Sequence, residues 1–99
     1  MLNIVKERRD DALTVKLEGR LDTTTAPELE GALRDELSEV KALVFDLSGL
    51  EYISSAGLRV LLSTQKTMNR QGSMKLIGVN ETIMEIFSIT GFCDILTIE

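Results

Sequence analysis

The sequence has no histidine and no tryptophan, and it contains one cysteine, one proline, one tyrosine and three phenylalanines among 99 residues. Without histidine there is no Ser-His-Asp triad and no imidazole to act as a general base or a metal ligand. With only one cysteine as well, we expect neither a zinc site nor any other cofactor. Cys93 has no partner for an internal disulfide, and its apolar neighbours Phe92 and Ile95 predict a buried thiol.

Basic charge is also scarce. The chain carries 11 basic and 16 acidic side chains, which gives a formal net charge of −5. Nucleic acids and anionic membranes bind basic patches, so we expect neither as a partner and expect a protein instead. No apolar run is long enough to cross a bilayer or to form the core of a secretion signal, which predicts a cytoplasmic protein.

The length and composition predict one domain over residues 1–99. A hydrophobic content of 43% is enough for a single core in a chain of this size. No segment is polar enough to link two domains, and no internal repeat is present. Because no heptad pattern or large exposed apolar stripe demands self-association, we expect the free protein to be a monomer.

The first half of the chain predicts a β-hairpin followed by a helix. Residues 13–17 alternate apolar and polar side chains as a half-buried strand does, and a strand over 3–9 precedes them across a two-residue turn, Asp10 and Asp11. Thr25 and Glu28 have the spacing of a capping box, with Pro27 in the first turn, so a helix should begin there. Its apolar stripe consists of Ala26, Leu29, Leu33, Leu37 and Val40.

The second half alternates strands and helices. Residues 42–47 are almost continuously apolar, which is typical of a central strand covered on both faces. A helix follows Ser54 and Ser55 and ends near Gly72, a strand covers 75–79, Asn80 caps a third helix that ends at Gly91, and a short strand covers 95–98. The order β-β-α-β-α-β-α-β predicts an α/β domain with a mixed, mostly parallel sheet.

Polar loops follow the strands at 13–17 and 42–47, and the carboxyl ends of parallel strands meet at one edge of a sheet. The expected cluster there consists of Asp22, Thr23, Thr24, Ser54 and Ser55. Each residue also has a simpler interpretation. Asp22 and the threonines are ordinary capping and turn residues, Asp46, Ser48 and Gly49 suit a strand end and a turn, and one of the two serines caps its helix.

The two serines do not have the surroundings of a catalytic nucleophile. The Gly-x-Ser-x-Gly motif of a nucleophile elbow is absent, as is a glycine-rich loop followed by Lys-Ser or Lys-Thr that would bind a phosphate. A serine at a helix N-terminus is well placed to carry a phosphoryl group, because unpaired backbone N–H groups and the helix dipole stabilise negative charge there. We therefore expect a protein that is modified rather than an enzyme.

Three segments together resemble the STAS domain of bacterial anti-sigma factor antagonists over essentially the full chain. They are Gly19-Arg-Leu-Asp22, Leu43-Val-Phe-Asp-Leu-Ser-Gly-Leu50 and Tyr52-Ile-Ser-Ser-Ala-Gly-Leu58. The resemblance implies that Ser55 is phosphorylated by a partner that is both a serine kinase and an anti-sigma factor, and that a PP2C-type phosphatase reverses the modification. The unphosphorylated protein would bind the anti-sigma factor, release the sigma factor and so regulate transcription.

The resemblance also implies a partner-binding surface, which would consist of Asp22, Thr23, Thr24, Ser54, Ser55, Ala56, Gly57 and Arg59. One position departs from the family. The acidic residue that usually precedes the acceptor is Ser54 here, so Ser54 is a second candidate acceptor. The alternative function is a constitutive interaction or sensory module that binds a protein or a nucleotide and is never phosphorylated.

Overall fold

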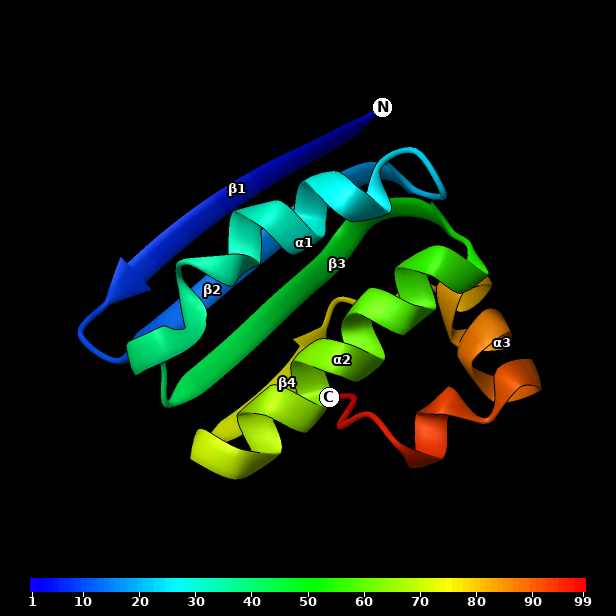
Figure 1. The fold of residues 1–99 in the computed structure, drawn as a ribbon. Helices are drawn as coiled ribbons and strands as arrows, with labels where there is room; N and C mark the ends of the chain where they lie inside the picture. Colours follow the sequence, from blue (N-terminus) through cyan, green and yellow to red (C-terminus); the bar gives the residue numbers. More distant parts are fainter.

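The computed structural model describes residues 1–99, which form four strands, three α-helices and two short 3₁₀ helices (Figure 1). The elements are β1 (Leu2–Arg9), β2 (Ala12–Leu21), α1 (Ala26–Arg34), η1 (Leu37–Glu39), β3 (Ala42–Ile53), α2 (Ser55–Gln71), β4 (Ser73–Ile77), α3 (Glu81–Thr90) and η2 (Phe92–Asp94). No helix combines the length and the apolar character that crossing a bilayer requires.

The four strands lie in one sheet in the order β1-β2-β3-β4. β1 and β2 form the predicted antiparallel hairpin, in which Asp10 takes a left-handed conformation, with φ at 54°, to make the two-residue turn. β3 pairs in parallel with both β2 and β4, so the prediction of a central strand is confirmed. The prediction that it is covered on both faces is wrong, because its side chains alternate between buried and half-buried positions and the helices pack on one face only. The prediction of an α/β domain with a mixed, mostly parallel sheet is confirmed.

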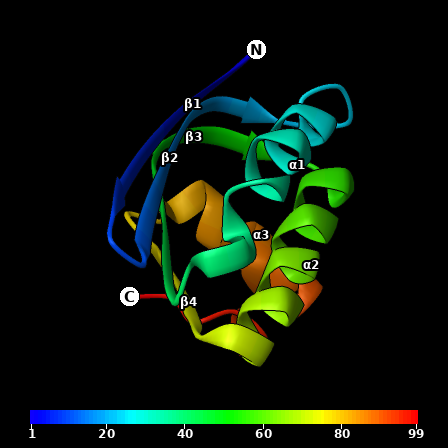
Figure 2. The ribbon, with the colours of Figure 1, turned by 60° about the vertical axis from the view of Figure 1, so that its left-hand side comes forward.

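Helices α1 and α2 pack side by side on one face of the sheet, and α3 lies beyond α2 against β3 (Figures 1 and 2). Leu13, Val15 and Leu17 of β2 point into this helical layer and are fully buried. The intervening side chains point to the other face, where Lys16 is exposed and Thr14 is half-buried. The sheet therefore has one packed face and one face open to solvent.

Several predicted boundaries are wrong. α1 ends at Arg34, so Leu37 lies in η1 and Val40 in the connection to β3, although both stay partly or fully buried. β2 and β3 run on to Leu21 and Ile53, and β4 begins two residues earlier than expected. The predicted last strand is reduced to an isolated parallel bridge between Ile98 and Leu76.

The prediction of a buried Cys93 is also wrong, because the thiol is exposed. Residues 92–94 form η2, a single tight turn after the left-handed Gly91. Phe92 packs against the core and Leu96, just after this turn, is buried, which leaves Cys93 on the solvent side.

Candidate functional site at the carboxyl ends of β2 and β3

The two polar segments of interest leave β2 and β3 side by side. Leu21 and Ile53 are paired at the ends of the parallel strands, and the backbone N–H of Ser54 donates to the carbonyl oxygen of Leu21 at 2.9 Å. Residues 22–24 and the start of α2 therefore meet at one edge of the molecule. The structure brings together the residues that the sequence places after these two strands.

Asp22 organises the first of these segments. Its Oδ1 accepts hydrogen bonds from the hydroxyl and the backbone N–H of Thr24, at 2.8 and 3.0 Å, and from the backbone N–H of Thr25 at 3.1 Å. The hydroxyl of Thr24 contributes most to holding the pKa of the Asp22 carboxyl below its ordinary value of 3.8. Asp22 is half-buried, whereas Thr23 and Thr24 are exposed.

The predicted capping box at Thr25 is absent. The Thr25 hydroxyl makes no cap hydrogen bond and is buried, because it donates to the carbonyl oxygen of Arg20 and accepts from the backbone N–H of Asp22, both at 2.8 Å. The capping-box pattern assigns the cap to Thr25 and leaves Asp22 free. In the structure Asp22 itself ties the loop to the start of α1, and only its Oδ2 is without a hydrogen bond.

Ser54 and Ser55 have different environments at the start of α2. Ser54 is the N-cap, with its Oγ accepting from the backbone N–H of Gly57 at 3.4 Å, and it is half-buried. Ser55 is the first helical residue, and its exposed hydroxyl makes no hydrogen bond within the protein. Gly57 is buried against Leu21 and leaves no room for a side chain, while Ala56 packs against the core.

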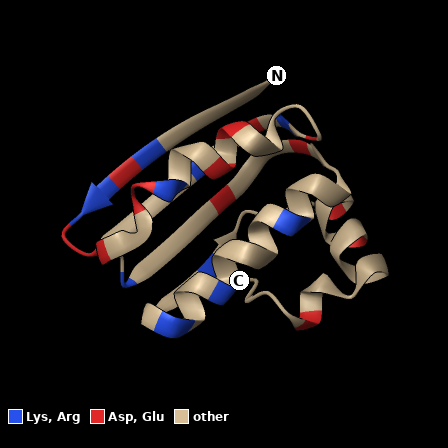
Figure 3. Cartoon of the chain, in the orientation of Figure 1, with Lys and Arg blue, Asp and Glu red and all other residues tan.

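Helix α2 is basic. It contains Arg59, Lys66 and Arg70 and no acidic residue, in contrast to α1 and α3, which each contain two glutamates (Figure 3). Arg59 lies four residues after Ser55, the spacing at which two side chains share a helix face. It is exposed and forms no ion pair with the rest of the chain.

Two further residues lie beside this edge and were not among the predicted site residues. The guanidinium carbon of Arg20 lies 4.5 Å from the centroid of the Tyr52 ring, and Arg20 Nε lies 3.9 Å from Asp22 Oδ2. A β-bulge makes the pairing possible. Gly19 pairs with Leu50 and Arg20 with Tyr52, so Glu51 is an extra residue in β3. The bulge is a feature of how the two strands pair, so the alternation of side chains along one segment does not predict that Arg20 and Tyr52 lie opposite each other.

Asp46, Ser48 and Gly49 do not form the turn that the sequence suggested. They lie inside β3, where a second register shift separates the pairs Lys16–Asp46 and Glu18–Gly49. The backbone N–H of Ser48 donates to Asp46 Oδ1 at 3.0 Å and is the main cause of a lowered pKa of this carboxyl. This hydrogen bond holds the irregular segment of the strand in place.

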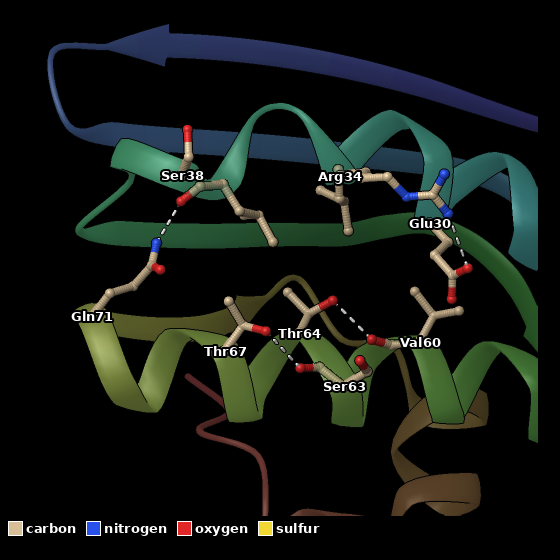
Figure 4. Close-up of a pocket in the computed structure, with 10 residues that line it drawn as sticks. Glu30, Arg34, Ser38, Val60, Ser63, Thr64, Thr67 and Gln71 are labelled. Atoms are coloured by element: carbon tan, nitrogen blue, oxygen red, sulfur yellow. Dashed lines mark hydrogen bonds and ion pairs between the residues drawn. The ribbon is translucent and has the colours of Figure 1, made fainter.

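A groove of about 470 Å³ lies elsewhere, between the C-terminal part of α1, η1 and α2 (Figure 4). Most of its polar groups are already engaged, since Thr64 and Thr67 donate to carbonyl oxygens one turn back and Gln71 donates to the carbonyl oxygens of Leu37 and Val40. None of the predicted site residues lines this groove. No three Cys, Asp or Glu side chains gather as a metal ion would require.

The fold and the site define a small α/β domain that presents polar loops where two parallel strands end. The STAS domain family model matches residues 3–99. The "Anti-sigma-B factor antagonist" of Listeria monocytogenes is 34% identical over 99 residues, covering 96% of this chain and 85% of that protein. The chain therefore belongs to the STAS domain family.

Solved structures agree with this assignment. An anti-sigma factor antagonist from Mycobacterium paratuberculosis superposes with a TM-score of 0.89 at 25% identity, over 99% of this chain and 85% of that chain. The Bacillus cell fate determinant SpoIIAA in its phosphorylated form superposes with a TM-score of 0.77 at 15% identity, over 98% of this chain and 91% of that chain. The second likeness shows a shared fold alone.

Proposed function

We propose that this protein is an anti-sigma factor antagonist that acts by partner switching. In its unphosphorylated form it binds a cytoplasmic anti-sigma factor that is also a serine kinase, and it thereby frees a sigma factor for transcription. Phosphorylation of Ser55 breaks the complex, and a PP2C-type phosphatase restores the binding form. The name of the Listeria relative supports the antagonist role. In this proposal the domain is the substrate of the kinase rather than an enzyme.

The observation that carries the proposal is the exposed, unengaged hydroxyl of Ser55 beside the Asp22 loop. A kinase must reach the acceptor hydroxyl, and Ser55 is exposed while its Oγ has no hydrogen bond to lose. Ser54 is half-buried and its Oγ accepts from the Gly57 N–H, so modification there would require the cap to rearrange. These differences favour Ser55 over Ser54 as the acceptor.

The position of Ser55 explains how a phosphoryl group could change binding and leave the fold intact. The group adds roughly −1.5 to −2 charge at neutral pH. At the first residue of α2 the helix dipole and free N–H groups stabilise this charge, and α2 has no acidic side chain to repel it. Arg59, one turn further along, provides a nearby cation. The same charge facing an acidic surface of a partner costs several kcal/mol, order of magnitude.

Two substitutions at Ser55 test the switch. Ser55→Asp should abolish binding to the anti-sigma factor of the host bacterium, and Ser55→Ala should bind as wild type does but accept no phosphate. Binding is measured by calorimetry with purified proteins. Phosphopeptide mass spectrometry after incubation with host cytosolic extract and Mg·ATP locates the modified residue. Thermal unfolding shows whether both variants keep the fold.

Ser54→Ala is the matched control, because it removes the neighbouring hydroxyl and leaves Ser55 in place. It should still be phosphorylated at Ser55 and should still bind. If Ser55→Asp and Ser55→Ala both bind as wild type and no phosphate is found, the protein is a constitutive interaction module. If no anti-sigma factor of the host binds the wild-type protein, the antagonist role itself is wrong.

A further inference from the structure

The Arg20 side chain is positioned by its neighbours, but its guanidinium forms no hydrogen bond within the protein. Its side chain is 55% exposed, it stacks on Tyr52 at 4.5 Å, and its closest carboxylate contact is the 3.9 Å approach to Asp22 Oδ2. That distance is too long for a hydrogen bond, and the guanidinium donates none to the rest of the protein. A planar group with five N–H donors therefore lies over an aromatic ring, and none of those donors has an acceptor within the protein.

The packing of the core does not require this pair. The neighbouring residues Leu21 and Ile53 point into the helical layer and are buried, whereas Arg20 and Tyr52 point to the open face of the sheet. The bulge at Glu51 is what brings the Tyr52 ring opposite Arg20. Bulges are common beside functional sites, where they redirect a side chain. Exposed tyrosine and arginine side chains are also the residue types that most often dominate binding energy at protein interfaces.

We propose that Arg20, supported by Tyr52, is a specificity residue of the docking surface and receives a carboxylate of the anti-sigma factor. The inference rests on the proposed function and names one chemical feature of its partner. An aspartate or glutamate there can accept two parallel N–H bonds from the guanidinium, which Asp22 does not do. The pair is continuous with the Ser55 edge, because the strand ends that hold Arg20 and Tyr52 lead directly into Asp22 and Ser54.

The phosphoryl group of Ser55 is a less suitable anion for Arg20. Ser55 belongs to α2, which lies on the packed side of the sheet (Figure 2), while the Arg20 guanidinium lies over Tyr52 on the opposite face. The basic residue on the same helix face as Ser55 is Arg59. A partner that covers the edge of the sheet can reach both faces at once, so a carboxylate of the partner is the occupant that fits the geometry.

Calorimetry with the host's anti-sigma factor tests the inference in the unphosphorylated state. Arg20→Glu should weaken binding by about tenfold or more, and Arg20→Lys should weaken it less, because the charge remains but the bidentate geometry is lost. Tyr52→Phe should bind as wild type, since the ring stays, and Tyr52→Ala should weaken binding. Arg9→Glu is the matched control, because Arg9 is 85% exposed at the far end of β1.

A charge swap identifies the opposing group. Acidic interface residues of the anti-sigma factor are replaced by arginine one at a time, and one replacement should restore binding to Arg20→Glu. The inference fails, with the proposed function intact, if wild type binds, Ser55→Asp does not, and Arg20→Glu binds like Arg9→Glu. It also fails if Arg20→Glu alters only the phosphorylated protein, since Arg20 would then serve the phosphate. Absence of wild-type binding would instead overturn the proposed function.

Discussion

Gly57 stands where the first turn of α2 meets the ends of β2 and β3. A Cβ atom at this position would lie 2.7 Å from Leu21 Cγ and 2.8 Å from Ile53 Cγ1, both in buried side chains. Those distances are shorter than carbon atoms tolerate, so the helix or these two buried side chains must shift. This close contact fixes the position of the N-terminus of α2, and therefore of Ser55, relative to the Asp22 loop.

Gly57→Ala should therefore destabilise the protein by about 1–3 kcal/mol, the usual cost of overpacking a core. Urea denaturation measures the free energy of unfolding. Gly31→Ala is the matched control, because Gly31 lies in α1 and a Cβ atom added there would have no neighbouring atom within 4 Å. It should stabilise the protein by roughly 0.5–1 kcal/mol through better helix propensity. Equal effects of the two substitutions would contradict the close packing at Gly57.

Helices α2 and α3 begin in the same way but are anchored differently. Asn80 caps α3 by accepting from the backbone N–H of Ile83 at 3.0 Å, and its Nδ2 also donates to the carbonyl oxygen of Leu50 at 2.7 Å. Ser54 makes one cap bond, at 3.4 Å. The cap of α3 thus also joins the helix to the central strand, while the cap of α2 is local.

Asn80→Ala should cost about 1–2 kcal/mol of stability, and Ser54→Ala should cost less, because only Asn80 leaves both a helix N–H and a strand carbonyl without partners. Thermal and urea unfolding of the two variants give the comparison. An equal or larger loss in Ser54→Ala would show that the bond to Leu50 contributes nothing.

Elements with a regular period and a good cap could be predicted from sequence, as the start of α2 and both ends of α3 show. β3 could not be predicted in full. Its buried residues Leu47, Leu50 and Ile53 are three apart, because bulges add a residue between successive inward side chains. This spacing is as compatible with a helix or a loop as with a strand, so the sequence predicts the strand only as far as residue 47.

The start of α1 shows a different limit. Thr25 and Glu28 satisfy the capping-box pattern, but the Thr25 hydroxyl instead bonds to the backbone of Arg20 and Asp22. A capping-box pattern shows which hydrogen bonds a side chain is able to form. Which of them it forms depends on the tertiary packing around it. The convergence of Asp22 with Ser54 was predictable because parallel pairing alone determines it.

At the scale of the whole molecule, the lowered pKa values of Asp22 and Asp46 link stability to pH. A carboxyl whose pKa is lower in the folded state contributes stability above its unfolded pKa, and this contribution is lost as pH falls through the folded value. Both carboxyls should therefore contribute fully at neutral pH and lose their contribution below about 3.8. Acid should destabilise the protein by protonating these two hydrogen-bonded carboxylates.

Asp22→Asn tests this linkage, because an amide oxygen can still accept from Thr24 and Thr25 but does not titrate. The difference in free energy of unfolding between wild type and Asp22→Asn should be largest near neutral pH and should shrink as the pH falls below 3.8. Urea midpoints measured across this range provide the test. Asp35→Asn is the matched control, because it removes an exposed carboxylate outside any hydrogen-bond network.

The alternation along the ends of β2 and β3 has a consequence for evolution. Leu21 and Ile53 belong to the core, while Arg20 and Tyr52, their immediate neighbours, belong to the solvent face. Substitutions at positions 20 and 52 can therefore accumulate with little effect on folding. After a gene duplication, two copies can diverge at these positions until each recognises its own partner, so that several such pairs work in one cell without cross-talk.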